Sequence, residues 1–190
     1  GHRDARFLGA TAGLGGAVAK VDLGGVLAGP GARSELVGVS LPEKRQHHDH
    51  HTVHQHISGH TSSNIDFKVA VTDRARSVYT GLIRIEEDAP ASEAFQENRN
   101  LLLSERARVD TIPELEILTD DVSCSHGATA APVDPEQIFY LQSRGIAAGA
   151  ALRLVVQGFV ETTLRLMPDN LRAELEAMLE ERLQRIEELV

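Results

Sequence analysis

The sequence predicts a mainly β chain that ends in a small α-helical domain. Residues 1–133 consist of short runs rich in β-branched and aliphatic residues, separated by glycine, proline and polar turns. From Asp134 onward, apolar residues recur instead at the three- and four-residue spacing of helices. We therefore expect a β domain over residues 1–133 and a helical domain over residues 134–190.

A weak internal repeat favours a β-solenoid for the first domain. The tripeptide Ala32-Arg33-Ser34 recurs as Ala75-Arg76-Ser77, an offset of 75 − 32 = 43 residues, and Ala107-Arg108-Val109 is a partial third copy. This offset fits two solenoid turns of about 20 residues each. Three matches of this length also arise by chance, so the repeat alone leaves a β-sandwich open.

The first strands are expected over residues 17–23, 26–27 and 35–41, where Gly24-Gly25 and Gly29-Pro30-Gly31 form the boundaries. Residues 92–103 are ambiguous, because helix propensity there competes with two features. Asn98 and Asn100 disfavour a helix interior, and the leucines at 101–103 also fit a buried strand. We interpret this segment as part of the solenoid.

The helical domain contains three expected helices. Asp134 is a plausible N-cap with Pro135 at the first helical position, and Gly145 ends this helix. A second helix is expected over residues 147–167, where Pro168 ends it, and a third from residue 169 to the end. The third carries an apolar stripe of the kind that packs against a neighbouring surface.

Composition excludes several classes of partner. The 190 residues carry a net charge of −9 and no Lys/Arg cluster, which argues against nucleic acid or an anionic membrane as main partner. No apolar run approaches the roughly 20 residues that span a bilayer. The single cysteine excludes an internal disulfide and fits a cytoplasmic protein.

The segment around that cysteine is the first candidate site. In an extended segment, Cys124 and His126 would lie on one face about 7 Å apart, where both could reach one metal ion or sulfur species. Two ligands do not complete a zinc or cluster site, which normally has four, so further ligands would come from elsewhere or from a partner.

A histidine run is the second candidate site. Seven of the nine histidines lie between His47 and His60, and on a strand His48, His50, His54 and His56 share one face. Imidazoles on one face can bind Zn, Ni or Fe, so a stand-alone metal-dependent β-helix enzyme is an alternative function. A polar edge of the solenoid and adventitious uptake of metal are the simpler interpretations.

Five ordered segments resemble the SufD branch of the SufB/SufD family, which assembles iron–sulfur clusters in the SUF system. The segments are residues 46–52 (QHHDHHT), 94–104 (AFQENRNLLLS), 113–117 (PELEI), 124–129 (CSHGAT) and 139–146 (FYLQSRGI). The resemblance implies a right-handed parallel β-helix followed by a helical domain. Since the N-terminal region of SufD-like proteins is not matched, the chain is expected to be a core-domain fragment.

The resemblance also implies a non-catalytic scaffold with two partners. A SufB-like subunit would pair through the β-helix, and a SufC-like ABC ATPase, the source of any ATP, would dock on the C-terminal helices. A transient iron–sulfur cluster would form at the SufB–SufD interface with His126 as ligand and Cys124 nearby. Flavin involvement stays open, and the fragment is expected to form a homodimer. The expected partner-binding residues are Phe139, Tyr140, Arg144, Leu152 and Phe159.

Overall fold

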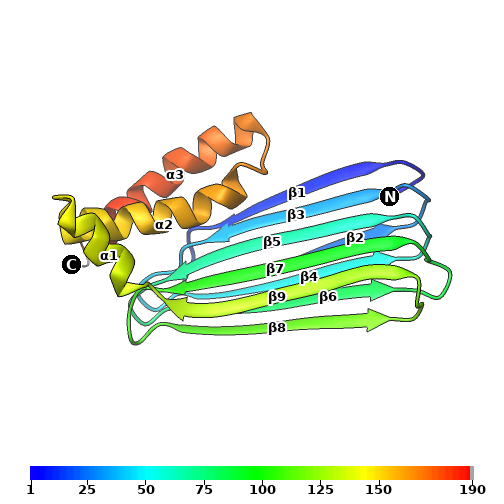
Figure 1. The fold of residues 1–190 in the computed structure, drawn as a ribbon, viewed down its shortest axis with the longest axis horizontal. Helices are drawn as coiled ribbons and strands as arrows, with labels where there is room; N and C mark the ends of the chain where they lie inside the picture. The colour runs from blue at the N-terminus through cyan, green and yellow to red at the C-terminus, as the bar shows by residue number, and fades with distance from the viewer. Residues whose placement is uncertain (189–190) are drawn as a thin grey trace.

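The computed structural model describes residues 1–188 and shows a parallel β-solenoid followed by three helices (Figure 1). Successive strands alternate between two sheets, in the spatial orders β1-β3-β5-β7-β9 and β2-β4-β6-β8, and all neighbours are parallel. The mainly β fold is thereby confirmed as a solenoid. The strands are β1 Arg6–Gly13, β2 Val18–Leu27, β3 Arg33–Ser40, β4 His47–His56, β5 Ser62–Val71, β6 Arg76–Ile85, β7 Ser92–Leu102, β8 Arg108–Ile117 and β9 Val122–Pro132.

One solenoid turn is longer than the sequence repeat suggests. Arg6 pairs with Arg33 and Arg76 pairs with Arg108, so each turn takes about 30 residues. The expectation of two short turns per repeat was wrong, because the tripeptides at 32–34 and 75–77 begin strands on opposite sheets. They are one and a half turns apart, since each turn contributes one strand to each sheet.

The ambiguous segment at residues 92–103 is strand β7. Its even-numbered residues Ala94, Gln96, Asn98 and Asn100 are buried, while the odd-numbered residues between them are more exposed. This two-residue alternation is the pattern of a pleated strand with one face towards the solenoid interior. The amide side chains on that face form hydrogen bonds inside the solenoid. Burial against the neighbouring strand therefore overrides the helix propensity of this segment.

The three helices lie where the sequence predicts them: α1 Pro135–Ser143, α2 Ala148–Leu164 and α3 Asp169–Glu187. Asp134 caps α1 by accepting a 2.8 Å hydrogen bond from the backbone N–H of Glu136. Helix α2 lies across the outer face of β3 and β5 (Figure 1). The expected third helix continued to the end of the chain, and its last two positions, 189 and 190, are outside the described residues.

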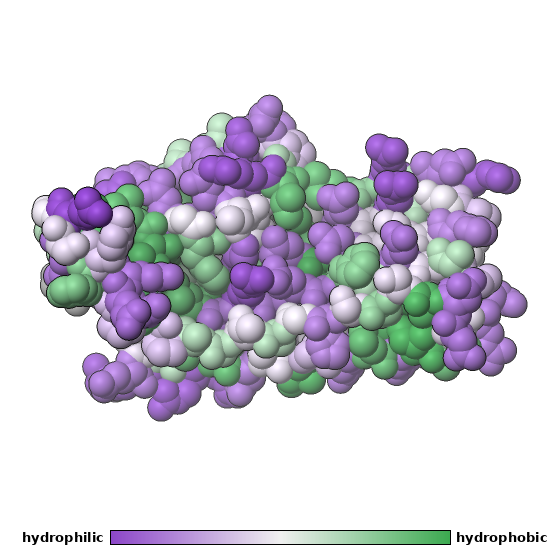
Figure 2. Space-filling view, viewed as in Figure 1, coloured by the Kyte–Doolittle hydropathy of each residue, from purple (hydrophilic) through white to green (hydrophobic). Residues whose placement is uncertain are grey.

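The helices and the solenoid share a hydrophobic cluster. Val37 and Ala70 on the outer face of the sheet pack with Val156 and Val160 of α2 and with Leu179 of α3. In Figure 2, hydrophobic surface on the visible face gathers in patches near the helices and towards the opposite end of the solenoid. None of the helices within residues 1–188 has the length and apolar character needed to cross a bilayer.

Helix α3 is also attached to the first turns of the solenoid by charge. The guanidinium group of Arg182 contacts the carboxylate of Glu43 and donates to the backbone carbonyl of Leu14, and Arg185 lies 3.3 Å from Glu43. Burial of Glu43 would raise its pKa, but the hydrogen bond and charge of Arg182 hold that pKa below its usual value. Glu43 is therefore ionised and paired at neutral pH.

Candidate functional site

Cys124 and His126 lie on β9, which pairs with β7 in the last turn of the solenoid. In this pairing Cys124 is opposite Ala94 and His126 is opposite Gln96, and both β7 residues are buried inside the solenoid. Because side chains of paired strands point to the same side, Cys124 and His126 both face the interior. The segment is extended, so the expected common face is confirmed.

The last turn leaves this interior face open. No strand follows β8 and β9 in either sheet within residues 1–188, so their inward side chains are uncovered on one side. Most of them are apolar and half-buried, and His126 is the exposed ionisable group among them. The inward residues are Val109, Thr111, Pro113, Leu115 and Ile117 on β8, and Val122, Cys124, His126, Ala128 and Ala130 on β9.

The two candidate ligands differ in their surroundings. Cys124 is half-buried and packs against a cluster formed by Ile83, Ile85, Ala89 and Ala94. This burial raises the pKa of the Cys124 thiol, so the neutral thiol is favoured over the thiolate. His126, in contrast, is exposed on the last strand and is accessible without any rearrangement.

The histidine run forms β4, and its alternation is as expected. The side chains of His48, His50, His54 and His56 are at most 2% exposed and point into the solenoid. On the outer face of the same strand, His51 lies 3.1 Å from Asp49. The expected shared face of the four even-numbered histidines is therefore confirmed.

Three of the four buried histidines contact hydroxyl groups. Ser40 Oγ lies 2.8 Å from His48 Nδ1, and Ser34 Oγ lies 2.8 Å from His54 Nε2. Thr61 and Ser63 flank His56 at 2.7 and 2.8 Å. Burial lowers the pKa of His50, His54 and His56 to about 4 and lowers that of His48 as well. These four side chains are therefore neutral at pH 7.

The run does not form a metal site by itself in the described part of the chain. Among residues 1–188, no three His, Cys, Asp or Glu side chains converge as metal ligands. His50 instead packs against the ring of Phe67, with the ring centroids 5.5 Å apart. A metal-dependent enzyme built on this run would therefore need ligands beyond those that the run itself brings together in residues 1–188.

A row of amide side chains faces the solenoid interior and was missed by the sequence analysis. Gln96 donates to the carbonyl of Gly81 and Asn98 to that of Phe67, each at 3.3 Å, while Asn100 donates to Asn98 Oδ1 at 2.7 Å. Amides at every second position of residues 96–100, alternating with charged residues, are the signal that could have predicted a polar interior here.

The expected partner-binding residues fall into two groups. Phe139 and Tyr140 on α1 are 71% and 58% exposed, and the Arg144 guanidinium lies 5.2 Å from the centre of the Tyr140 ring. Leu152 is buried in the shared hydrophobic cluster, and Phe159 packs on the edge of that cluster. The first group forms an available surface, whereas the second holds α2 on the solenoid.

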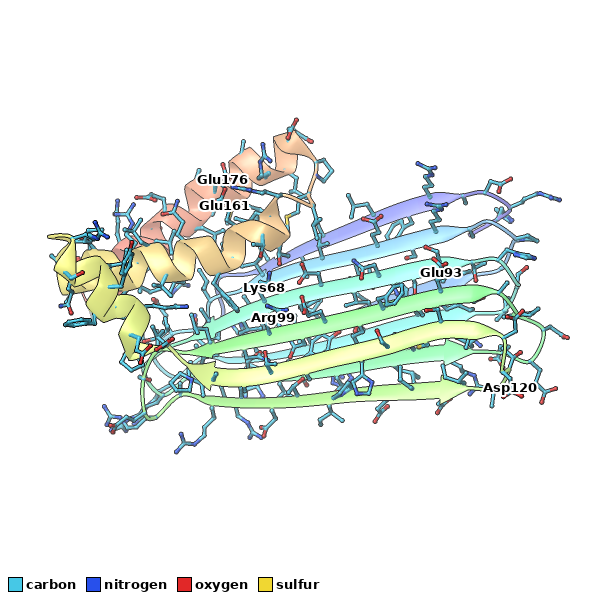
Figure 3. All side chains as sticks on the ribbon, in the orientation of Figure 1. Lys68, Glu93, Arg99, Asp120, Glu161 and Glu176 are labelled. Atoms are coloured by element: carbon cyan, nitrogen blue, oxygen red, sulfur yellow. The ribbon has the colours of Figure 1, made fainter. Side chains whose placement is uncertain are left out.

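A basic pair lies beneath α2 on the outer face of the sheet. Lys68 of β5 is opposite Arg99 of β7, and Figure 3 shows the two side by side below the helix. The Lys68 ammonium group donates to Thr162 Oγ1 and lies 5.8 Å from the centre of the Phe159 ring. Phe159 thus has an intramolecular partner, while Arg99 pairs with Glu97 at 2.6 Å.

Comparison with known proteins identifies the family. Residues 1–159 match the model of the SUF system FeS cluster assembly SufBD core domain. The chain is 37% identical over 171 residues to the iron–sulfur cluster assembly protein SufD of Escherichia coli (strain K12), covering 90% of this chain and 40% of that protein. It is 35% identical over 190 residues to a SufBD family protein of Mycobacterium leprae (strain TN), covering 95% of this chain and 48% of that protein.

The chain thus spans less than half the length of these two relatives. The family match nevertheless covers the whole solenoid and continues through α1 into α2. It includes β4 with the histidine run and β9 with Cys124 and His126, and so agrees with the resemblance of the five sequence segments. The chain belongs to the SufBD core-domain family of SUF-system iron–sulfur cluster assembly proteins.

Proposed function

We propose that the chain is a non-catalytic scaffold on which a nascent iron–sulfur cluster is built together with a SufB-like subunit. Membership of the SufBD family supports an assembly role, and the observation that supports the position of the site is His126 on the open last turn. The cluster is the cargo of this scaffold and is released to other proteins. We also propose that the protein acts in the cytoplasm.

The partner would pair with the last turn of the solenoid. Strands β8 and β9 are the edge strands of their sheets in the described chain, and an edge strand presents unpaired backbone N–H and C=O groups. The apolar inward side chains of this turn would be covered by the same contact. Pro113 removes a backbone donor from the middle of β8, whereas the proline of β9, Pro132, is its last residue, so β9 offers the longer uninterrupted edge for pairing.

His126 would supply one ligand from the centre of that contact. An imidazole is a suitable ligand for iron, and an exposed one on an apolar surface would be shielded from water once the partner covers it. Cys124 lies two residues away on the same face as an additional thiol. The remaining ligands would come from the SufB-like subunit, which accounts for the incomplete set on this chain.

A SufC-like ATPase would dock on the exposed surface of α1. Phe139, Tyr140 and Arg144 combine two large aromatic rings with a guanidinium group, which is the composition of interface hot spots. Leu152 and Phe159 would contribute indirectly, because they hold α2 against the solenoid and so fix the direction in which α1 projects.

The test is co-purification with SufB-like and SufC-like partners, followed by anaerobic reconstitution with iron and sulfide and a visible absorption spectrum. We expect a His126→Ala variant to form the complex but to lose most of the cluster absorption. His51→Ala is the matched control, because His51 is also a partly exposed strand histidine but lies on the outer face of β4. It should build the cluster normally.

Two other results would contradict parts of the proposal. Equal cluster yield in the His126→Ala and wild-type complexes would show that His126 is not a cluster ligand, but it would not contradict the scaffold role. Failure of the wild-type chain to join any complex, although folded by circular dichroism, would reject the scaffold role for this chain.

A further inference from the structure

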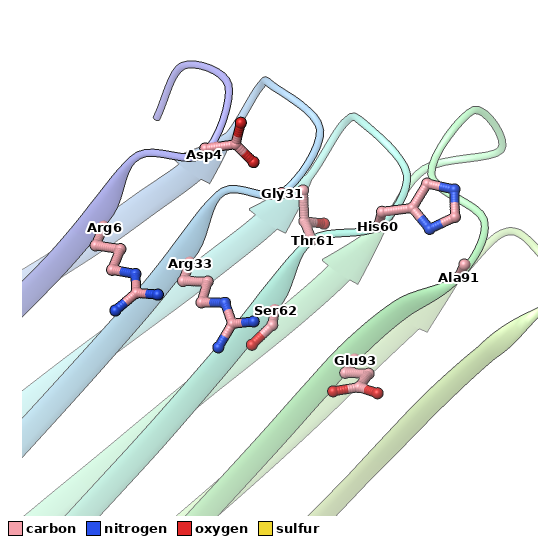
Figure 4. A pocket seen from close by; sticks show the side chains of 9 residues that line it. All are labelled: Asp4, Arg6, Gly31, Arg33, His60, Thr61, Ser62, Ala91 and Glu93. Atoms are coloured by element: carbon pink, nitrogen blue, oxygen red, sulfur yellow. The ribbon is translucent and has the colours of Figure 1, made fainter.

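A polar pocket lies at the end of the solenoid where the strands of the larger sheet begin. Its volume is about 350 Å³, and it is formed by the starts of β1, β3, β5 and β7 and by the turns that precede them. Figure 4 shows the side chains around it. Neither Cys124 nor His126 lines this pocket, so it is separate from the proposed cluster site. The lining residues are Asp4, Arg6, Gly31, Arg33, His60, Thr61, Ser62, Ala91 and Glu93.

Two arginines stand next to each other in this pocket. Arg6 is opposite Arg33 in the pairing of β1 with β3, and Arg33 is opposite Ser62 in the pairing of β3 with β5. Paired strands lie about 4.8 Å apart, so the two guanidinium groups are close enough to interact. In Figure 4 they extend in the same direction, and the Ser62 hydroxyl lies beside the guanidinium group of Arg33. Like charges placed in this way repel one another.

The nearby carboxylates do not neutralise this pair. Within residues 1–188, neither Arg6 nor Arg33 has a carboxylate within the 4.0 Å of an ion pair. Asp4 approaches Arg3 instead, at 3.7 Å, and Glu93 lies on β7 beyond Ser62. Asp4 and Glu93 also line the pocket, but neither forms an ion pair with Arg6 or Arg33 in the described chain, so the guanidinium donors of both arginines are unoccupied by carboxylates.

Another pair of adjacent arginines in the same solenoid is compensated. Arg76 is opposite Arg108, but Arg76 donates to the carboxylate of Asp110 at 2.5 and 3.0 Å. Arg108 donates to the backbone carbonyls of Glu105 and Ala107 at 2.9 and 2.8 Å. Since the fold provides acceptors for that pair, the lack of such acceptors for Arg6 and Arg33 within residues 1–188 leaves their donors available to a ligand.

The turns around the pocket fix its shape but do not supply its donors. Asp4, Gly31, His60 and Ala91 occupy the left-handed region, with φ between 53° and 75°, in four successive turns of the solenoid. Their backbone N–H groups already donate to carbonyls of neighbouring turns. Recognition of a ligand would therefore rely on the side chains of Arg6, Arg33 and Ser62.

We propose that this pocket binds a phosphate group, held between the guanidinium groups of Arg6 and Arg33. Guanidinium groups bind phosphate through paired N–H donors, and the Ser62 hydroxyl beside Arg33 provides a further donor. The pocket volume exceeds that of a phosphate ion alone, which leaves room for an organic group attached to the phosphate. Glu93 at the rim lowers the affinity for anions, since its charge opposes theirs.

The experiment is titration calorimetry of the purified chain with inorganic phosphate and, separately, with ribose 5-phosphate. We expect saturable binding that weakens as the salt concentration rises. The Arg33→Ala variant should bind about tenfold more weakly or worse, because one charge-assisted contact is lost. The Glu93→Gln variant should bind more tightly. Tighter binding of ribose 5-phosphate than of phosphate would identify a phosphate carried by an organic molecule, and equal binding would identify the free ion.

The matched control is Arg76→Ala, which removes an exposed outward-facing arginine whose partner is a carboxylate. Its affinity for both probes should equal that of the wild type. Circular dichroism would establish that each variant is folded. Absence of saturable binding by the wild-type chain, or an equal loss of affinity in Arg33→Ala and Arg76→Ala, would overturn the proposal.

Discussion

The hydroxyl of Thr163 on α2 donates a 3.0 Å hydrogen bond to the carboxylate of Asp66 on β5, which joins residues 97 positions apart in the sequence. Both side chains are buried beneath the helix, and Asp66 Oδ1 has no hydrogen-bond partner within the described chain. Burial raises the pKa of Asp66, because removing its carboxylate from water costs free energy. The hydrogen bond from Thr163 reduces this cost. The contact fixes α2 on the solenoid.

Removing the donor should therefore destabilise the chain. We expect Thr163→Val to lower the free energy of unfolding by about 1–3 kcal/mol, because Asp66 would stay buried without its donor. Asp66→Asn is the informative comparison, since it keeps an acceptor and removes the buried charge, and it should be tolerated at pH 7. Urea denaturation measures both. Equal loss of stability in the two variants would contradict this account.

Acid should destabilise the chain through the histidines of β4. The pKa of His50, His54 and His56 is about 4 in the folded protein against 6.5 for an unperturbed histidine. Between these values the unfolded chain binds protons that the folded chain does not, so stability falls as the pH falls from about 6.5 to about 4. Each histidine contributes about 2 kcal/mol of this loss between pH 8 and pH 5.

His50→Leu provides the test, because His50 packs against Phe67 and its Nδ1 atom has no hydrogen-bond partner within residues 1–188. The variant should fold, and its unfolding free energy should depend less steeply on pH between 5 and 8 than that of the wild type. Denaturation curves at several pH values give both slopes. Parallel slopes would mean that His50 does not remain neutral on folding.

The proposed ATPase dock can be tested without disturbing the fold. Deleting α3 is unsuitable, because Leu179 and Leu183 belong to the shared hydrophobic cluster. Substituting both Phe139 and Tyr140 with Ala should leave the melting temperature unchanged, since these rings are exposed, and should weaken binding of a SufC-like partner about tenfold or more. Met178→Ala, on the exposed side of α3, is the control. Unchanged binding of the SufC-like partner by the double variant would show that the ATPase binds at another surface.

The open last turn should also drive self-association of the isolated chain. We expect a homodimer at high concentration through the edge strands β8 and β9, as measured by light scattering. Leu115→Lys places a charge on the inward face of that turn and should yield a monomer, whereas Ile112→Lys places the same charge on the outer face of β8 and should not. A wild-type monomer at high concentration would refute this prediction.

The sequence predicted the helices more accurately than the strands and their stacking, since Gly24-Gly25, expected as a strand boundary, lies within β2. Proline, glycine and capping residues such as Asp134 act locally, and the helix bounds at α1 follow from them. The number of residues in one solenoid turn depends on which strands pair with each other. The repeated tripeptides at 32–34 and 75–77 do not reveal this number, because they stand at the starts of strands that belong to opposite sheets. Nothing local in the sequence distinguishes two short turns from one and a half longer ones.

The site was predicted in the same uneven way. The common face of Cys124 and His126 follows from strand alternation alone, and so does the inward position of His50. Cys124 is less exposed than His126 because a hydrophobic cluster packs against Cys124 alone, and this contact depends on the tertiary structure. The juxtaposition of Arg6 and Arg33 required the register between strands on successive solenoid turns, which no short motif encodes.

The parallel pairing of strands on successive turns has a consequence for how the molecule is made on the ribosome. Each new strand pairs with one synthesised a single turn earlier, so the solenoid can grow as the chain emerges. Helix α3, which attaches to Glu43 and Leu14, is synthesised after all nine strands. The contact of α3 with the first turns therefore forms only after the solenoid strands have been made, and the order of synthesis sets the order of assembly.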